Sequence, residues 1–354
     1  MPELVLRVGG RDYAGWKTIR VTRGIECVAG SFAVSVSDRW ADQDVPWPIG
    51  EEDECVVLID GEPVITGYVD RRDLSYGPEE HTLTIGGRDK AAALVDCSAL
   101  PGQWEYWGIP LLTLVQRLAK PFGIVPRLQP GLKPPSVPTR LAIDPGDSAL
   151  DVIERACRVA GVLPVSDGAG GLVLTRPGSA RTATSLVEGQ NVLGASARYD
   201  ASHRYRRYVV MGQQPGSDQG TAETTAFVRG YATDPNVRRA ERVLVVRSEN
   251  SITPEQAKRR AQWEATVRAA RGDEVTALVQ GWKQGNGELW PVNELVKVRL
   301  PYLGVSGELL ISQATYSLDD HSGTTTELWL KRPDAFVPEP VIPSAAWKEL
   351  AGGV

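Results

Sequence analysis

Short runs of alternating hydrophobic and polar residues dominate the start of the chain. Residues 32–37 carry an apolar side chain at every second position, which is the period of a half-buried strand. Between the apolar runs at 55–59 and 64–69 stands Asp60-Gly61, a dipeptide typical of tight hairpin turns. Five short runs separated by turn-rich breaks therefore predict a small β-barrel or sandwich over residues 1–97.

The spacing of apolar positions then changes to a helical period. Helices are predicted near residues 110–120 and 148–160, and the second begins at Ser148 with a capping-box pattern. Two apolar runs around a glycine-rich turn predict a hairpin over residues 162–176. We expect residues 98–182 to form a small α/β insert.

Strand-like runs return over residues 183–334, which we interpret as a second β-barrel module. One helix interrupts them at 253–271, where Thr253 is the expected cap and Pro254 the first helical residue. The proline-rich segment 335–354 is expected to be a C-terminal tail that is either disordered or docked on a partner.

The two β regions share an internal pattern. Residues 54–89 run strand, tight turn, strand, polar loop with His81, strand, and residues 294–334 repeat that order around His321. We interpret this echo as two similar modules in one chain. The predicted fold class is α+β and β-dominated: two similar β-barrel modules with an α/β insert and one additional helix.

Composition supports many short strands, because 36 glycines and 25 prolines make up 61 of 354 residues. The net charge is −5, and residues 1–100 hold 18 acids against 10 bases. The most basic stretch runs from Arg198 to Arg207. It overlaps residues 205–211, which also read as a strand that enters a core with its own arginines solvated, so a nucleic-acid site is not favoured there. The sequence shows no secretory signal, so we expect a soluble protein that is synthesised in a cytoplasm. It shows no apolar run of about 20 residues, so we expect no membrane insertion.

The sequence offers little catalytic chemistry. The four cysteines form no CxxC pair, and Cys55 and Cys157 are expected to be buried thiols. Three scattered histidines give no metal-binding spacing, and no phosphate-binding loop or nucleophile motif occurs. We therefore predict no catalytic residue, no metal and no cofactor. A carboxylate pair for glycoside cleavage remains an alternative, although no motif selects any two of the 44 acids.

Aromatic residues are the remaining site markers. Trp104, Tyr106 and Trp107 lie within four positions of a predicted loop. Such a group is typical of a partner-contact patch, and equally of a lid over the core of the insert, with glycan binding a third interpretation. Trp347, in the tail, is the fourth residue that we expect at a partner interface.

Several segments together resemble one family. The helix and hairpin of residues 147–177 resemble a segment of phage baseplate hub proteins. Residues 290–298, 309–316 and 323–328 are similar to the closing strands of the Mu-like members, and residues 15–38 fit their first strands. The resemblance extends over about residues 1–335 and agrees in order along the chain.

This resemblance implies two β-barrels with α/β additions, assembled as a homotrimer. Such a trimer would form a ring in the tail baseplate of a virion, after assembly in the host cytoplasm. The ring would join a sixfold tail tube to a threefold central spike, contact other baseplate proteins and let DNA pass. We hypothesise that the acids of residues 1–100 line that channel and repel DNA phosphates. The alternatives are a tail-associated peptidoglycan hydrolase and a glycan-binding β module.

Overall fold

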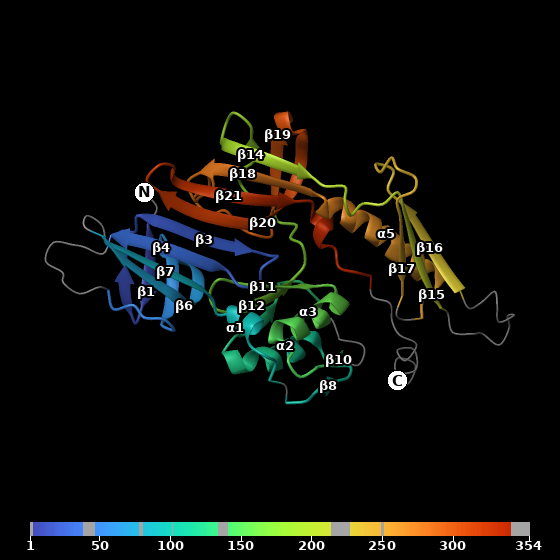
Figure 1. Ribbon diagram of the computed structural model, residues 1–354, viewed down its shortest axis with the longest axis horizontal. Helices are drawn as coiled ribbons and strands as arrows, with labels where there is room; N and C mark the ends of the chain where they lie inside the picture. The colour runs from blue at the N-terminus through green and yellow to red at the C-terminus, as the bar shows by residue number, and fades with distance from the viewer. Residues whose placement is uncertain are drawn as a thin grey trace.

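The computed structural model describes residues 3–37, 47–77, 81–100, 102–133, 141–213, 227–248 and 251–340 (Figure 1). Strands predominate in this part of the chain, and the helices lie in two separate places, below and at one end of a long sheet. The predicted β-dominated α+β fold is therefore confirmed.

The first module is an antiparallel arrangement in the order β3-β4-β7-β6-β5-β1-β2. Its elements are β1 (Leu4–Val8), β2 (Arg11–Tyr13), β3 (Thr18–Gly24), β4 (Ser31–Ser37), β5 (Glu54–Ile59), β6 (Glu62–Tyr76) and β7 (His81–Asp89). Phe32, Val34 and Val36 are buried in β4, as the period of two predicts. Asp60 and Gly61 both adopt positive φ (49° and 83°), the conformation that an Asp-Gly hairpin turn requires.

The insert follows β7 and lies beneath the sheet in Figure 1. It contains α1 (Ala92–Asp96), β8 (Glu105–Tyr106), α2 (Leu111–Ala119), β9 (Pro126–Leu128), β10 (Leu141–Ala142), α3 (Ala149–Ala160), β11 (Leu163–Ser166) and β12 (Leu172–Thr175). Ser148 and Asp151 form the reciprocal capping box at the start of α3, and Gly161 ends that helix in a left-handed conformation. The buried faces of α2 and α3 meet in a separate hydrophobic core.

The second module has the order β14-β18-β21-β20-β19-β13. These elements are β13 (Leu186–Val187), β14 (Val192–Tyr199), β18 (Asp273–Gln280), β19 (Leu295–Leu300), β20 (Val305–Asp319) and β21 (Gly323–Lys331). β20 also pairs with β3, so the sheets of the two modules are continuous. Among the described residues these pairings form one open path with a branch at β20. The closed barrels and the domain limits at 97, 182 and 334 thus stay predictions.

One part of the second module differs from the expectation. The apolar runs at 208–211 and 243–246 belong to a separate three-stranded sheet of β15 (Arg207–Gln213), β16 (Phe227–Thr233) and β17 (Val243–Arg247). This sheet packs against α5 (Pro254–Arg271) at the end of the molecule opposite the first module (Figure 1). A Cβ on Gly230 would lie 2.1 Å from the backbone carbon of Ala257, so glycine permits the close approach of helix and sheet. The inserted element is therefore an α/β unit and not a lone helix.

The internal repeat is confirmed, and it is longer than the sequence indicated. β5, β6 and β7 contain 6, 15 and 9 residues, and β19, β20 and β21 contain the same numbers. Each long strand has one bulge near its middle in the pairing with the following strand, after Val69 in β6 and after Ile311 in β20, one residue apart in their positions along the strands. The neighbouring strands β4 and β3 correspond in turn to β18 and β14. Five strands thus recur with one pattern of pairing, and the β15–β17 and α5 unit is inserted between β14 and β18.

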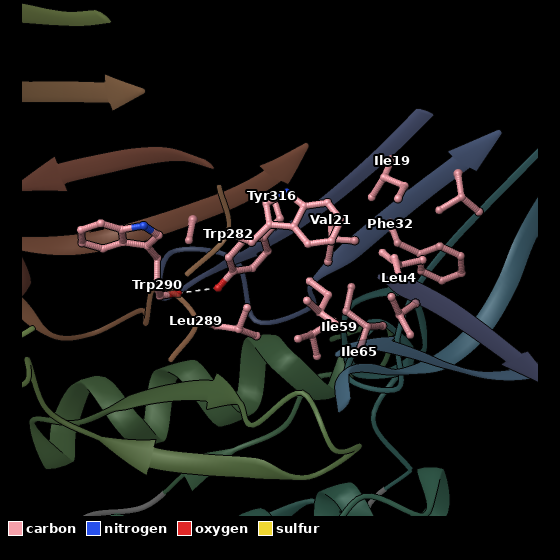
Figure 2. Packing of buried hydrophobic residues seen from close by; sticks show 14 of the residues in the cluster. Leu4, Ile19, Val21, Phe32, Ile59, Ile65, Trp282, Leu289, Trp290 and Tyr316 are labelled. Carbon is pink, nitrogen blue, oxygen red and sulfur yellow. Dashed lines mark hydrogen bonds between the residues drawn. The ribbon is translucent and has the colours of Figure 1, made fainter. Parts of the chain in front are cut away.

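A single core runs through both modules (Figure 2). Ile19, Phe32 and Ile65 from the first module are in the same cluster as Trp282 and Tyr316 from the second. The hydroxyl of Tyr316 donates a hydrogen bond to the carbonyl oxygen of Trp290. This shared core explains why the two modules form one body.

The described part of the C-terminal tail packs against α5 of the same chain. After a short 3-10 helix at Pro333–Phe336, the indole nitrogen of Trp263 in α5 donates to the carbonyl oxygen of Val337 at 2.8 Å. Arg260 pairs with Glu339. Ala335, Val337 and Glu339 therefore contact α5. The tail beyond residue 340, including Trp347, lies outside the described residues.

Candidate interaction surfaces

The three aromatic residues of the insert loop do not share one environment. One fits the interpretation as a lid over the core, and two fit the interpretation as a partner-contact patch. Tyr106 is 4% exposed and belongs to the core of the insert, where its ring lies 5.8 Å from the guanidinium of Arg117. Trp104 and Trp107 are 53% and 64% exposed. The pairing of β8 with β10 and a hydrogen bond from the nitrogen of Ile143 to the carbonyl oxygen of Trp104 fix the loop. Tyr106 thus acts as a lid, and the two tryptophans present aromatic surface, of which Trp107 lines an open hollow.

A second surface was missed from the sequence. α5 covers one face of the β15–β17 sheet, and the opposite face carries exposed Phe227, Tyr231 and Val245. Three exposed arginines share that face: Arg207, Arg229 and Arg247. None of them pairs with a carboxylate in the described part of the chain. Aromatic and arginine side chains are enriched at protein interfaces, so this face is a candidate contact surface. The sequence pattern that indicates this face is the alternation of side chains on either side of β16, a segment that was not predicted to be a strand.

The basic stretch before β15 has a structural role that is only partly as expected. Tyr208 and Val210 enter the core, as predicted. Arg204, however, is mostly buried and pairs with the buried carboxylate of Asp234 at 2.8 Å. The guanidinium of Arg206 donates to the carbonyl oxygen of Asp234 at 3.3 Å. Of the arginines in the predicted strand, Arg207 is exposed, as predicted. Arg204 lies just before that strand and connects the loop to the end of β16.

Several strand edges are open among the described residues, and two of them lie at corresponding places of the repeat. The first is β14, a terminal strand of the large sheet that is paired on one side by β18. The second half of β6, Arg71 to Tyr76, pairs with β7, and β5 reaches only as far as Tyr68 on the other side. Tyr76 is 87% exposed and Tyr199, at the end of β14, is 60% exposed. Open strand edges offer backbone groups to another strand.

The buried ionisable groups have structural partners. Asp89 accepts hydrogen bonds from the backbone nitrogen of Ala91 at 2.9 Å and from the hydroxyl of Ser166 at 2.8 Å, and burial raises the pKa of this carboxyl. Cys55 and Cys157 are buried, as predicted, and burial raises the pKa of each thiol to about 12. Thiols with such pKa values are poor nucleophiles at neutral pH.

The described ranges contain no group of three or more His, Cys, Asp or Glu side chains suited to a metal ion. His321 lies in the turn after β20, where its backbone nitrogen donates to Asp319 at 2.8 Å. No helix in the part of the chain that the structure covers is long and apolar enough to cross a membrane.

Comparison with known proteins identifies three segments. Residues 3–89 match the N-terminal domain of Mu phage baseplate assembly protein GpP-like. Residues 91–176 match the second domain of baseplate hub protein gp44-like, and residues 253–339 match the fourth domain of Mu phage baseplate assembly protein GpP.

Individual relatives agree with these matches. The chain is 31% identical to baseplate hub protein gp44 of Escherichia phage Mu over 342 residues, which cover 94% of this chain and 89% of that protein. Among solved structures, the 43 kDa tail protein of prophage MuSo2 from Shewanella oneidensis superposes with a TM-score of 0.83 at 32% identity, covering 95% of this chain and 99% of that one. The tail protein from Neisseria meningitidis MC58 shares the fold, with a TM-score of 0.78 at 22% identity over 96% and 98% of the two chains. The chain therefore belongs to the baseplate hub protein family of Mu-like phages.

Proposed function

We propose that this chain assembles as a homotrimer that forms the hub ring of a contractile-tail baseplate. The observation that carries the proposal is the repeat of five strands, β3-β4-β7-β6-β5 and β14-β18-β21-β20-β19, within one sheet. Three chains with two similar modules each present six similar units around a threefold axis. Such a ring matches a sixfold tube on one side and a threefold spike on the other.

The proposed partners follow from that position. The trimer binds the central spike, the tail tube and other baseplate proteins, and it surrounds a channel through which DNA passes without sequence recognition. The surplus of acids in residues 1–100 suits the channel wall, because negative charge there repels DNA phosphates. The site of action is the tail baseplate of the virion, and assembly takes place in the host cytoplasm.

We propose that the role is structural and not catalytic. The exposed Trp104 and Trp107 and the aromatic face of the β15–β17 sheet support contact with other proteins. The same exposed tryptophans suit a sugar ring, so glycan binding is the alternative that a specific observation favours. Alanine at Trp104 or Trp107 distinguishes the two, because only the glycan interpretation predicts saturable sugar binding that these variants abolish.

The test measures the mass of the full chain by light scattering, alone and mixed with its spike protein, together with negative-stain images. A mass of three 38.4 kDa chains and a ring-shaped particle are expected. A chain that stays monomeric in both samples would refute the trimeric hub. Lysis of purified cell wall by the same preparation would refute the non-catalytic role.

A further inference from the structure

The two modules of one chain meet through a strand pairing. Residues Gln313 to Leu318, the half of β20 beyond its bulge, run antiparallel to β3. In this junction Thr315 is opposite Thr22, and their hydroxyls lie 3.1 Å apart. The second module therefore presents β20 to the β3 edge of the first module.

The repeat places the same two kinds of edge on the outside of the chain. β6 corresponds to β20, and its half beyond the bulge, Arg71 to Tyr76, has no partner on that side among the described residues. β14 corresponds to β3, and it is one of the unpaired ends of the large sheet in the part of the chain that is described. Both segments are mostly exposed.

We propose that β6 of one copy pairs with β14 of a second copy, in the antiparallel register that the β20–β3 junction sets. This inference rests on the proposed trimer and names the contact that holds it together. Transferred through the matched strand pairs, the register places Arg71 opposite Asp200 of the second copy and Asp73 opposite Arg198 of the second copy.

Charge complementarity supports this register. In the single chain Arg71 pairs with Asp73 at 2.8 Å, and Arg198 lies 3.7 Å from Asp200, so each edge carries one base and one acid two residues apart. Antiparallel pairing sets each base opposite an acid. A slip of two residues would bring Arg71 opposite Arg198, and like charges directly opposite are destabilising.

The contact is head-to-tail, because each copy offers β6 to one neighbour and β14 to the other. Such a heterologous contact does not stop at a twofold dimer, and it closes into a ring when the rotation between copies divides a full turn, as in the proposed trimer. Around that ring the β20–β3 junction within a chain alternates with the β6–β14 junction between chains. Leu74, exposed in the single chain, becomes paired with Ala197 of the next copy on the side that faces the core.

The first test reverses charges in the full-length chain. We expect Asp73→Arg and Arg198→Asp each to weaken trimer association about tenfold in analytical ultracentrifugation, equivalent to about 1.4 kcal/mol. The double variant, with both changes in one chain, restores the opposite charges in every junction and returns association to within about threefold of the unchanged chain. Asp12→Arg is the matched control, since Asp12 is also an exposed acid paired with an arginine of its own module, at 2.6 Å. That control should leave association unchanged.

The second test fixes the register with a disulfide. Ser75→Cys combined with Ser196→Cys, in a chain whose exposed Cys27 and Cys97 are serine, should oxidise to covalent trimers on a denaturing gel. Ser75→Cys combined with Gly194→Cys is two residues out of register and should cross-link poorly, since disulfides require short Cβ–Cβ distances.

The outcomes separate this inference from the proposed function. If the unchanged chain is a trimer, and the single charge variants assemble like it or the cysteine pair fails to link copies, the strand pairing is refuted while the trimeric hub stands. If the double charge variant stays as weak as the single variants, the register is refuted. If the unchanged chain never forms a trimer, with or without its spike, the proposed function itself fails.

Discussion

The two modules have the same arrangement of strands and differ in the side chains that pack between those strands. At the bulged end of the first module β7 carries Gly86 and Gly87, where β21 of the second module carries Trp329 and Leu330. A Cβ on Gly87 would lie 2.2 Å from the carbonyl oxygen of Tyr68, whereas Leu330 is a fully buried core residue. The two modules therefore share strand lengths, strand pairing and a bulge, although their bulky side chains stand at different positions. Register and backbone hydrogen bonding define this repeat more than residue identity does.

Removing volume from the second module should have the largest effect. Leu330→Ala leaves a cavity in the common core, and we expect a loss of about 2–5 kcal/mol in the free energy of unfolding. Urea denaturation followed by circular dichroism measures it. A loss below about 1 kcal/mol would mean that the core collapses around the gap, and the contrast between the modules would then be unimportant for stability.

Adding volume to the first module at the equivalent position should also destabilise. Gly87→Ala brings a methyl group against the oxygen of Tyr68 and the ring of Phe32, and overpacking of this kind costs about 1–3 kcal/mol. Gly86→Ala is the control, because its nearest neighbour is an ordinary contact at 3.6 Å. Equal denaturation midpoints for the two variants would contradict the role of Gly87 as a packing residue.

The modules also differ where they end. Asp89, the last residue of β7, is buried and accepts hydrogen bonds from Ala91 and Ser166. When the bulges are aligned, the matching residue is Arg332, which directly follows β21 and is half-exposed beside Asp334. Asp89→Ala leaves those donors without an acceptor and should cost about 1–3 kcal/mol. Arg332→Gln, which removes a half-exposed ion pair, should cost less than about 1 kcal/mol.

The pH dependence of Asp89 has a definite sign. Burial raises the pKa of its carboxyl in the folded protein, so the folded state takes up a proton at a higher pH than the unfolded chain does. As pH falls through the raised pKa, the wild-type chain therefore gains stability relative to Asp89→Asn, which has no charge to lose. Urea unfolding of both chains at neutral and mildly acidic pH measures this difference. A difference independent of pH would contradict a buried charge at Asp89.

Local patterns predicted the local elements. The alternation around Phe32, the Asp-Gly turn at Asp60 and the cap at Ser148 each depend on neighbours in sequence, and the structure has them where the pattern indicates. The repeat was visible only where three strands follow one another along the chain. Its outer strands β14 and β18 are separated by the inserted unit, so no local pattern joins them.

The candidate surfaces show the same limit. Trp104 and Trp107 were found because they cluster in sequence, and they are exposed. The open edges of β6 and β14 have no distinctive sequence motif. They are recognised as edges only from the pairing of strands that are far apart in the sequence. The burial of Arg204 against Asp234 likewise depends on a partner 30 residues away.

A small effect is also expected at a core position where the modules already agree. Cys55 in β5 corresponds to Val296 in β19, since they occupy matching places opposite β6 and β20, and both are buried. Cys55→Val introduces the residue that the other module uses, with a β-branched side chain suited to a strand, and should change the free energy of unfolding by less than about 1.5 kcal/mol. The thiol of Cys55, with its pKa raised to about 12 by burial, is unreactive, so thiol titration of the native protein should give the same number of fast-reacting groups before and after the change. A loss comparable to that of Leu330→Ala would show that the first module depends on this cysteine in a way that the shared backbone does not explain.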